Sequence, residues 1–356
     1  MNKKIRVVQI GTQHDHAFFA FEAVSKLSDK YEIIGYFEPD DKAKKVANQN
    51  PLYAKYKQLS LTEVFERSPD AVIIETTEQE LTNYALMFAQ KGIHIHMDKP
   101  GGCSLAEFES LIKTVKNNNI IFHTGYMYRY NPALKKAEEL IKSGTLGEIY
   151  SVETHMSCTH PKEKRDWLER LPGGMMFYLG CHLIDIVLRF MGKPDRIVPY
   201  NFRSGFLGAT GEDNTFCLFE YKNGVSFAKT TAIEPSGFAR RQVVICGTRG
   251  TYEIKPLEDY FDKNTISLLK SNVSYSFADE DGTFTWKNDA VSKETFGPFD
   301  RYMPMMNAFA EMVCGERKNP FTPDYELELY RTILIACGLK QTISETEQHI
   351  ERGINK

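Results

Sequence analysis

Short apolar runs alternate with amphipathic stretches through the first 124 residues, and this rhythm limits the possible folds more than any other feature of the chain. The runs are rich in β-branched residues, as strands buried on both faces of a sheet are, and they occupy residues 5–10, 31–37, 71–74, 93–96 and 120–123. Helical patterns separate them, at residues 17–27, 41–48, 61–66, 81–90 and 104–116. This alternation predicts an α/β domain over residues 1–124, with a doubly wound parallel sheet.

The rhythm changes after Gly125. A helical pattern at 132–142 is followed by longer, more alternating strand patterns at 149–156, 214–221, 225–231, 242–247 and 250–254. Asn223-Gly224 between two of these is a strong hairpin signal. We expect residues 125–356 to form an α+β domain with a large, mostly antiparallel open sheet. Two final helices, at 302–314 and 324–343, could pack back on the first domain. The polar segment 276–292 predicts a surface excursion.

Composition excludes several classes of protein. A net charge of −3 gives no electrostatic footprint for nucleic acid or an anionic membrane surface. No apolar run approaches the roughly 20 residues that span a bilayer, and the first strand pattern begins without a signal peptide. Seven scattered cysteines without a C-x-x-C pair indicate reduced thiols in the cytoplasm rather than disulfides or a zinc site.

The first strand leads into Gly11-Thr12-Gln13-His14-Asp15-His16, where a dinucleotide fingerprint reads G-x-G-x-x-G/A. Gly11 can make the tight turn, but Gln13 and His16 stand where small residues are usual, so a bare strand-to-helix turn remains an alternative. Adjacent residues in a turn rarely converge on one ion. We therefore expect no metal site, and expect His14 and His16 to cap the helix or face the cofactor phosphates.

Glu38, at the end of the second strand, stands where an acidic side chain accepts hydrogen bonds from the adenosine ribose. Its charge would repel a 2′-phosphate, which favours NAD over NADP. Thr76 and Thr77, after the third strand, would line the same groove. A solvated loop carboxylate is the alternative for Glu38.

Lys99, in Asp98-Lys99-Pro100, follows the fourth strand at the sheet edge where ligands bind in such folds. It is either a surface charge or a catalytic group. Tyr178, His182 and Asp185 recur at three- to four-residue spacing, which predicts that they share one face of an otherwise apolar helix. A core histidine paired with Asp185 is the alternative for that helix.

Arg165 and Trp167 precede the Gly173-Gly174 turn, on a segment that could cover the pocket. An indole suits the C–H face of a sugar and a guanidinium suits an acidic group, although both residues are equally common as loop anchors. His155 and His160 could line the same mouth. We expect Arg129 to brace the junction between the domains.

The chain resembles the Gfo/Idh/MocA oxidoreductase family, which includes glucose-fructose oxidoreductase and inositol dehydrogenase. The resemblance rests on Asp98-Lys99-Pro100, which matches the usual E-K-P, on the helix that carries His182, and on segments 126–132, 144–149 and 247–250. It implies a Rossmann-type NAD(P)-binding domain and a second domain whose sheet packs against a partner subunit in a homodimer or homotetramer. The implied chemistry is NAD(P)-linked and acts on a carbohydrate-like small molecule.

Matched position by position, the resemblance makes Lys99 the catalytic lysine, His182 the catalytic histidine and Asp185 a substrate-binding residue. Tyr178 stands where the commoner D-x-G-x-H pattern has its aspartate. His182 would remove the hydroxyl proton while Lys99 stabilises the developing alkoxide. Tyr178 is either a second acid/base, its pKa lowered by Lys99, or a wall of the pocket.

Three functions fit these residues. The first is an NAD-dependent dehydrogenase of a sugar, cyclitol or sugar derivative. The second is a redox-neutral lyase or glycosidase that oxidises its substrate only transiently, to a keto-sugar. The third is a non-catalytic regulatory protein that binds a nucleotide or sugar. Retention of Lys99 and His182 favours the two enzymes.

Overall fold

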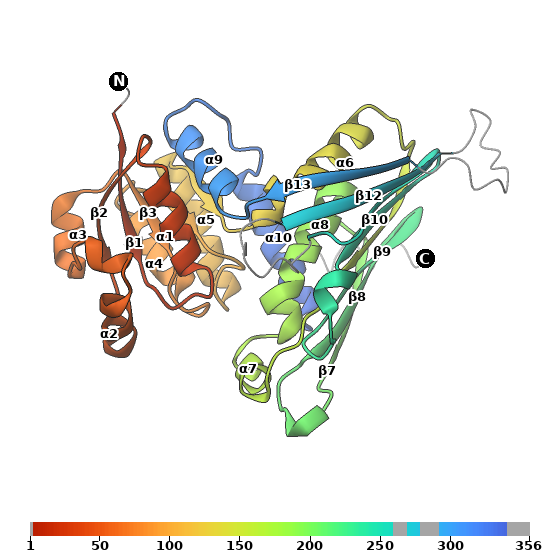
Figure 1. Ribbon diagram of the computed structural model, residues 1–356, viewed down its shortest axis with the longest axis horizontal. Helices are drawn as coiled ribbons and strands as arrows, with labels where there is room; N and C mark the ends of the chain where they lie inside the picture. Colours follow the sequence, from red (N-terminus) through yellow and green to blue (C-terminus); the bar gives the residue numbers. More distant parts are fainter. Residues whose placement is uncertain (1–2, 259–268, 278–291, 340–356) are drawn as a thin grey trace, which may run out of the picture.

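The chain forms two sheets side by side, with the C-terminal helices between them (Figure 1). The computed structural model describes residues 3–258, 269–277 and 292–339. Its five-stranded sheet has the order β2-β1-β3-β4-β5, and its eight-stranded sheet has the order β13-β12-β11-β10-β6-β9-β8-β7. The fold is therefore the predicted one, a doubly wound Rossmann-type sheet followed by an α+β domain.

All pairings in the first sheet are parallel. Its strands are β1 (Ile5–Ile10), β2 (Tyr31–Phe37), β3 (Ala71–Ile74), β4 (His94–Met97) and β5 (Phe122–Thr124). The helices between them are α1 (Ala17–Lys26), α2 (Asp41–Gln49), α3 (Leu61–Arg67), α4 (Leu81–Ala89) and α5 (Leu105–Asn118). Side-chain oxygens of Asp40, Ser60 and Ser104 cap three of these helices and fix where they begin. The parallel arrangement brings the ends of β1, β3 and β4 to one edge, where the loops with the candidate residues emerge.

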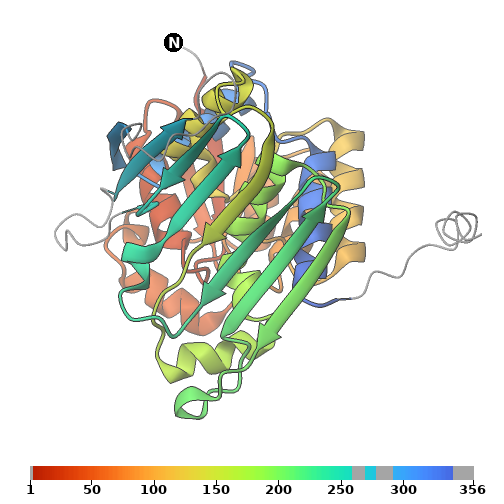
Figure 2. The same cartoon turned by 90° about the vertical axis from the view of Figure 1, so that its right-hand side faces the viewer.

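The second sheet is antiparallel except where β6 pairs in parallel with β9. Its strands are β6 (Ile149–His155), β7 (Arg196–Phe202), β8 (Asn214–Tyr221), β9 (Gly224–Thr231), β10 (Gln242–Gly247), β11 (Gly250–Ile254), β12 (Leu269–Phe277) and β13 (Ser292–Phe299). Helices α6 (Pro132–Lys142) and α8 (Cys181–Met191) lie on one face. Figure 2 shows that no described helix covers the other face.

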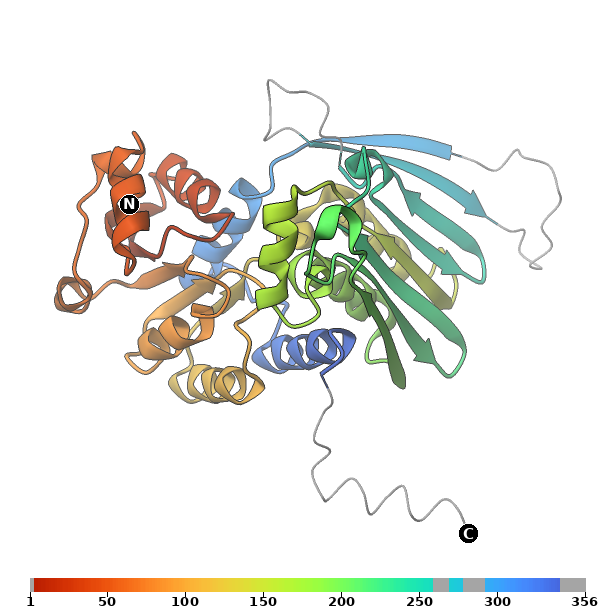
Figure 3. The same ribbon diagram turned by 90° about the horizontal axis from the view of Figure 1, so that it is seen from below.

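The last two helices join the domains. Helix α9 (Met303–Val313) packs against α1, and α10 (Pro323–Ala336) packs against both α5 and α8. Viewed from below, these helices fill the space between the two sheets (Figure 3). The candidate site thus lies between two domains that α9 and α10 hold together.

The second domain departs from the sequence-based expectation at the sheet edges. Strand β7 was not expected, because its residues are only partly buried and show weak apolar alternation. The polar segment 276–292 is not wholly an excursion, since β12 includes its first two residues and β13 begins at Ser292. Residues 278–291 lie outside the described ranges, as does the end of the final expected helix beyond 339.

Among the described helices, none combines the length and apolar character that crossing a membrane requires.

Candidate active site

Lys99 is the centre of the candidate site. It is only 2% exposed and follows β4, so the surface-charge alternative is wrong. Its Nζ donates a hydrogen bond of 2.8 Å to the backbone oxygen of Tyr178 in the second domain. The lysine therefore reaches from the nucleotide domain to the helix that carries the other candidate residues.

Tyr178 lies in a π-helical turn, Met176–Gly180, immediately before α8. Its ring centre is 4.9 Å from Lys99 Nζ. His182 and Asp185 both lie in α8, but Asp185 is bonded to Arg129 and Tyr325. The π-helical turn changes the spacing between Tyr178 and these two residues, and such a turn carries no sequence signal.

His182 is buried, and its Nδ1 has no hydrogen-bond partner among the described residues. Its ring meets the edges of Tyr128 and Tyr126, with ring centres 5.0 and 5.7 Å away. Burial, reinforced by the positive charge of Lys99, holds the pKa of His182 well below 6.5. The imidazole is neutral at neutral pH and can accept a proton. Asp185 is not its partner.

The phenol of Tyr178 faces a carboxylate. Its Oη donates to Asp15 Oδ2 at 2.5 Å, and Lys164 Nζ lies 2.8 Å from the same oxygen. Burial and the charge of Asp15 raise the pKa of Tyr178 far above 10. The expectation of a pKa lowered by Lys99 is therefore wrong, because the phenol oxygen points to a negative charge while Lys99 lies against the ring.

Asp185 pairs with Arg129. The guanidinium donates to both carboxylate oxygens, at 2.8 to 3.2 Å, and Tyr325 Oη donates to Oδ1 at 2.9 Å. Arg129 also contacts Glu326 of α10 at 2.6 Å, and all three charged groups are buried. The structure thus contradicts the substrate-binding role expected of Asp185, whose oxygens are engaged in an internal network. Arg129 braces α10 against α8, as expected.

Arg165 and His155 are anchors rather than pocket residues, contrary to the substrate-binding role expected of them. Buried Arg165 pairs with Asp213 at 3.1 Å and donates to the Phe206 backbone oxygen at 2.9 Å. His155 Nδ1 lies 3.0 Å from the Arg240 backbone oxygen. Each side chain bonds to polar groups of a neighbouring loop. The sequence spacing could not distinguish such an anchoring residue from a residue of the pocket.

Trp167, His160 and Lys164 do lie at the cleft. The rings of Trp167 and His160 have centres 5.6 and 5.9 Å from that of Tyr178. Lys164 belongs to α7 (Lys162–Trp167), and its Nζ is 3.9 Å from the Trp167 ring centre. A cavity of about 420 Å³ opens here between the two domains, lined by Gln13, Asp15, Thr77, Glu78, Gln79, Lys164, Trp167 and Arg170. The sequence assigned no role to Asp15, which occupies a variable position of the loop after the first strand, or to Lys164, which belongs to no motif.

The loop after β1 has the turn that a dinucleotide requires. Gly11 has φ +84°, and a Cβ there would lie 2.6 Å from the backbone of Thr76, so only glycine fits. Helix α1 begins at Ala17 without a side-chain cap from His16, the residue before it. Its first turn is instead closed by backbone bonds, since Ala17 N donates to the His14 backbone oxygen and Phe19 N to that of His16, each at 3.0 Å.

Glu38 fixes this loop. Its carboxylate accepts from Thr12 N at 2.6 Å, Thr12 Oγ1 at 2.7 Å, Gln13 Nε2 at 3.1 Å and Asp40 N at 2.9 Å. Because it is 1% exposed, the alternative of a solvated loop carboxylate is wrong. The residues present thus fit a dinucleotide at the loop turn, with a negative charge at the end of β2 (Tyr31–Phe37).

His14 does not face the phosphate side of the loop. It is buried beneath it, 3.3 Å from Asp98, and His16 approaches the same carboxylate at 3.0 Å. Both histidines thus approach one carboxylate, a contact that the sequence did not predict. Asp98, which follows β4, is their meeting point, and only the fold brings it there.

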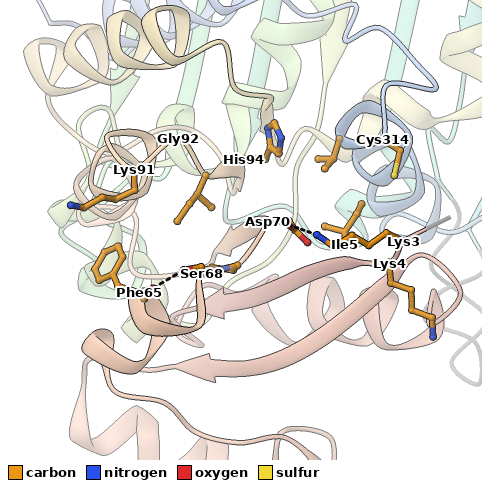
Figure 4. Close-up of a pocket in the computed structure, with 13 residues that line it drawn as sticks. Lys3, Lys4, Ile5, Phe65, Ser68, Asp70, Lys91, Gly92, His94 and Cys314 are labelled. Carbon is orange, nitrogen blue, oxygen red and sulfur yellow. Dashed lines mark hydrogen bonds and ion pairs between the residues drawn. The ribbon is translucent and has the colours of Figure 1, made fainter.

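A larger cavity, of about 720 Å³, lies at the opposite edge of the first sheet (Figure 4). It is lined in part by Lys3, Lys4 and Lys91, and Lys3 pairs with Asp70 at 3.3 Å. This edge holds the beginnings of β1 and β4, whereas Lys99 follows the end of β4. We therefore place the site in the cleft at the other edge.

Comparison with known proteins gives a consistent result. Residues 5–126 match the model of an oxidoreductase family with an NAD-binding Rossmann fold, and residues 134–253 match the GFO/IDH/MocA C-terminal domain. D-xylose 1-dehydrogenase (NADP(+)) 2 of Haloferax volcanii is 25% identical over 265 residues, covering 73% of this chain and 74% of that protein. The 2,7-anhydro-N-acetylneuraminate hydratase of Escherichia coli is 25% identical over 195 residues, 52% of this chain and 51% of the enzyme.

The solved structures agree on the fold. KijD10, a 3-ketoreductase from Actinomadura kijaniata solved with NADP and TDP-benzene, superposes with a TM-score of 0.74 at 15% identity, over 93% of this chain and 96% of that one. At this identity the likeness concerns the fold alone.

Proposed function

Because the chain belongs to the Gfo/Idh/MocA family of oxidoreductases, we propose that it is an NAD-dependent dehydrogenase acting on a CH–OH group of a sugar, cyclitol or sugar derivative. The observation that carries the proposal is the arrangement around Lys99. A buried lysine at the end of β4 reaches the helical segment of His182, a histidine that is kept neutral by its surroundings. A base and a cation close enough for the Lys99 charge to act on His182 are what oxidation of an alcohol requires.

His182 and Lys99 have different roles in the proposed reaction. Neutral His182 takes the hydroxyl proton of the substrate as general base. Lys99 donates a hydrogen bond to the same oxygen and stabilises the negative charge that develops there. When bound, NAD⁺ accepts the hydride that leaves the carbinol carbon. Tyr178, held by Asp15, shapes the pocket wall and excludes water without titrating.

The dinucleotide would be held by the loop after β1. Gly11 allows close approach of the backbone, Thr12 and Gln13 shape the turn through their hydrogen bonds to Glu38, and Thr76 and Thr77 flank the groove. His14 supports this loop from beneath. The buried charge of Glu38 supports NAD over NADP, because a 2′-phosphate at this strand end would be repelled.

A substrate screen tests the proposal. Aldoses, polyols and cyclitols are incubated with NAD⁺ or NADP⁺ while reduced nicotinamide is followed by its absorbance. We expect at least one substrate to reduce NAD⁺, and Lys99→Met and His182→Asn each to lower kcat/KM at least about 100-fold. Lys116→Met is the matched control, since that exposed lysine contacts only Asp324 among the charges described. Full turnover in either site variant would contradict the assignment.

A redox-neutral reaction is the second candidate. The similarity to a protein named as a hydratase and the replacement of a site carboxylate by Tyr178 both favour it. In that case the cofactor would stay bound through purification. Substrate would gain deuterium from heavy water next to the transiently oxidised carbon, with no net reduced nicotinamide. Net reduction without such exchange would exclude this candidate.

We further propose that the uncovered face of the eight-stranded sheet packs against a second copy of the chain, in a dimer or tetramer. Tyr200, Phe216 and Phe227 form a ring cluster on this sheet, with centres 6.2 and 5.5 Å apart, and Phe202 is 59% exposed. Light scattering should give an oligomer for the natural protein and a smaller species for Phe216→Asp. An unchanged mass for Phe216→Asp would place the interface elsewhere.

The seven cysteines, all within the described ranges, are free thiols. This state supports a reducing compartment, and we propose the cytoplasm.

A further inference from the structure

Beneath the loop after β1, two histidines and a carboxylate point toward one another. His14 Nδ1 lies 3.3 Å from Asp98 Oδ2, and His16 Nδ1 lies 3.0 Å from the same oxygen. One ligand atom from each of the three residues falls within 4.8 Å of the others. His14 and Asp98 are fully enclosed, while the His16 side chain is 16% exposed and gives access from the cleft.

The contact between His14 and Asp98 does not have the geometry of a hydrogen bond, although the atoms are 3.3 Å apart. The backbone N–H of His16 donates to the same Nδ1 at 3.3 Å, so this nitrogen carries a lone pair. The lone pair of His14 Nδ1 and the carboxylate oxygen of Asp98 repel each other at this separation unless a positive charge lies nearby. A hydrogen bond between them would have to be nearly linear, whereas two ligands of one metal ion bind it from different directions.

The distances suit a shared metal. Metal–ligand bonds of about 2.1 Å at angles of about 90–110° place neighbouring ligand atoms about 3.0–3.4 Å apart. The separation between His14 Nδ1 and Asp98 Oδ2, 3.3 Å, falls within that interval. The 3.0 Å between His16 Nδ1 and the same oxygen also falls within it, and this contact is a hydrogen bond that metal binding would replace.

Glu75 lies beside the cluster. It is fully buried, and its Oε2 is 3.7 Å from His14 Nδ1. Burial and the negative charge of Asp98 raise the pKa of Glu75 well above 4.5. A cation held by His14, His16 and Asp98 would offset the repulsion between these two carboxyl groups.

We propose that His14, His16 and Asp98 bind one divalent transition-metal ion. Two imidazole nitrogens and one carboxylate oxygen, with a fourth position left for water, suit Zn²⁺, Fe²⁺ or Co²⁺. Mg²⁺ and Ca²⁺ prefer oxygen alone, and the cluster has no thiolate for Cu⁺. The ion would tie the residues just before α1 to the end of β4, directly beside Lys99. This inference stands apart from the proposed redox function.

Cobalt provides the test, because its visible absorption reports coordination without any enzymatic turnover. The full-length protein is stripped with a chelator and titrated with Co²⁺, then with Zn²⁺ as competitor. We expect a visible band that saturates at one Co²⁺ per chain and disappears when Zn²⁺ is added. Absence of a band together with no Zn²⁺ retained after dialysis would overturn the proposal.

Variants locate the site. His16→Ala should weaken Co²⁺ binding by more than the roughly 10–100-fold that loss of an outer-shell contact costs, and Asp98→Asn should do the same. His160→Ala, another cleft histidine outside the cluster, should leave the band unchanged. Since His16 is partly exposed, His16→Ala should keep its circular dichroism spectrum and remain informative. A band retained in both ligand variants would refute the assignment, whether or not the protein binds dinucleotide.

Discussion

Replacing Asp185 with asparagine separates the two roles that this residue could have. In the structure its carboxylate receives three contacts from Arg129, at 2.8 to 3.2 Å, and one from Tyr325 at 2.9 Å. Asparagine keeps the size of the side chain but removes the charge, and it turns a donor toward the guanidinium. Arg129 then stays buried with Glu326 as its remaining partner.

The magnitude follows from burial. Breaking one partner of a buried ion pair costs about 3–5 kcal/mol, and because Glu326 still balances Arg129, we expect the lower end, about 3 kcal/mol. Asp324→Asn, on α10, is the matched control. Its side chain is 72% exposed and pairs with Lys116 at 2.8 Å, so its loss should cost about 0.5 kcal/mol or less.

Urea unfolding at fixed protein concentration, followed by tryptophan fluorescence and circular dichroism, gives the free energy of unfolding for each variant. The KM for substrate should change less than about threefold in Asp185→Asn, since its oxygens face the internal network. A loss of stability below about 1 kcal/mol combined with a large rise in KM would refute this reasoning and restore a substrate-binding role.

Three further outcomes are expected. Tyr178→Phe should keep kcat within about threefold across pH 6–9, because a phenol facing Asp15 does not titrate there; a tenfold loss of kcat would require a proton-transfer role. Glu38→Gln should raise the affinity for NADPH relative to NADH about tenfold in fluorescence titrations, about 1.4 kcal/mol of relieved repulsion; an unchanged ratio would exclude Glu38 as the selector. Burial raises the pKa of Glu258, but Arg301 and Arg241 outweigh it and hold that pKa below 4.5. The stabilisation that the charged Glu258 gives is therefore complete above pH 4.5 and is lost as the pH falls through the lower pKa of the folded protein. Glu258→Gln should make the melting temperature depend less on pH in the acid range. An unchanged acid dependence in thermal melts would contradict the ion pairs of Glu258 with Arg301 and Arg241.

The first domain could be predicted almost entirely from the sequence. Residues 5–10, 31–37 and 71–74 are strands with the expected bounds, because runs buried on both faces leave a continuous apolar signal. The outer strands of the second sheet gave no such signal. In β7, the Arg196–Phe202 residues are exposed or only partly buried, so apolar alternation hardly marks them.

The sequence indicated candidate residues better than it indicated their partners. Lys99 and His182 were singled out because each belongs to a recognisable motif, and their catalytic roles stay predictions. Asp185, Arg165 and His155 were expected at the pocket, yet each satisfies a charge or carbonyl supplied by a distant segment. A sequence shows which residue can ionise, but the identity of its partner depends on tertiary contacts such as that between Arg129 and Glu326, which lie 197 residues apart.

The identity of the bound nucleotide tests the proposed function most directly. The purified protein is denatured, the released nicotinamide is identified, and stripped protein is titrated with NADH and NADPH. We predict one site per chain, binding NADH at least about tenfold more tightly than NADPH. Absence of binding to either dinucleotide would contradict it, because the turn at Gly11 and the neutral base at His182 would then have no hydride acceptor to serve.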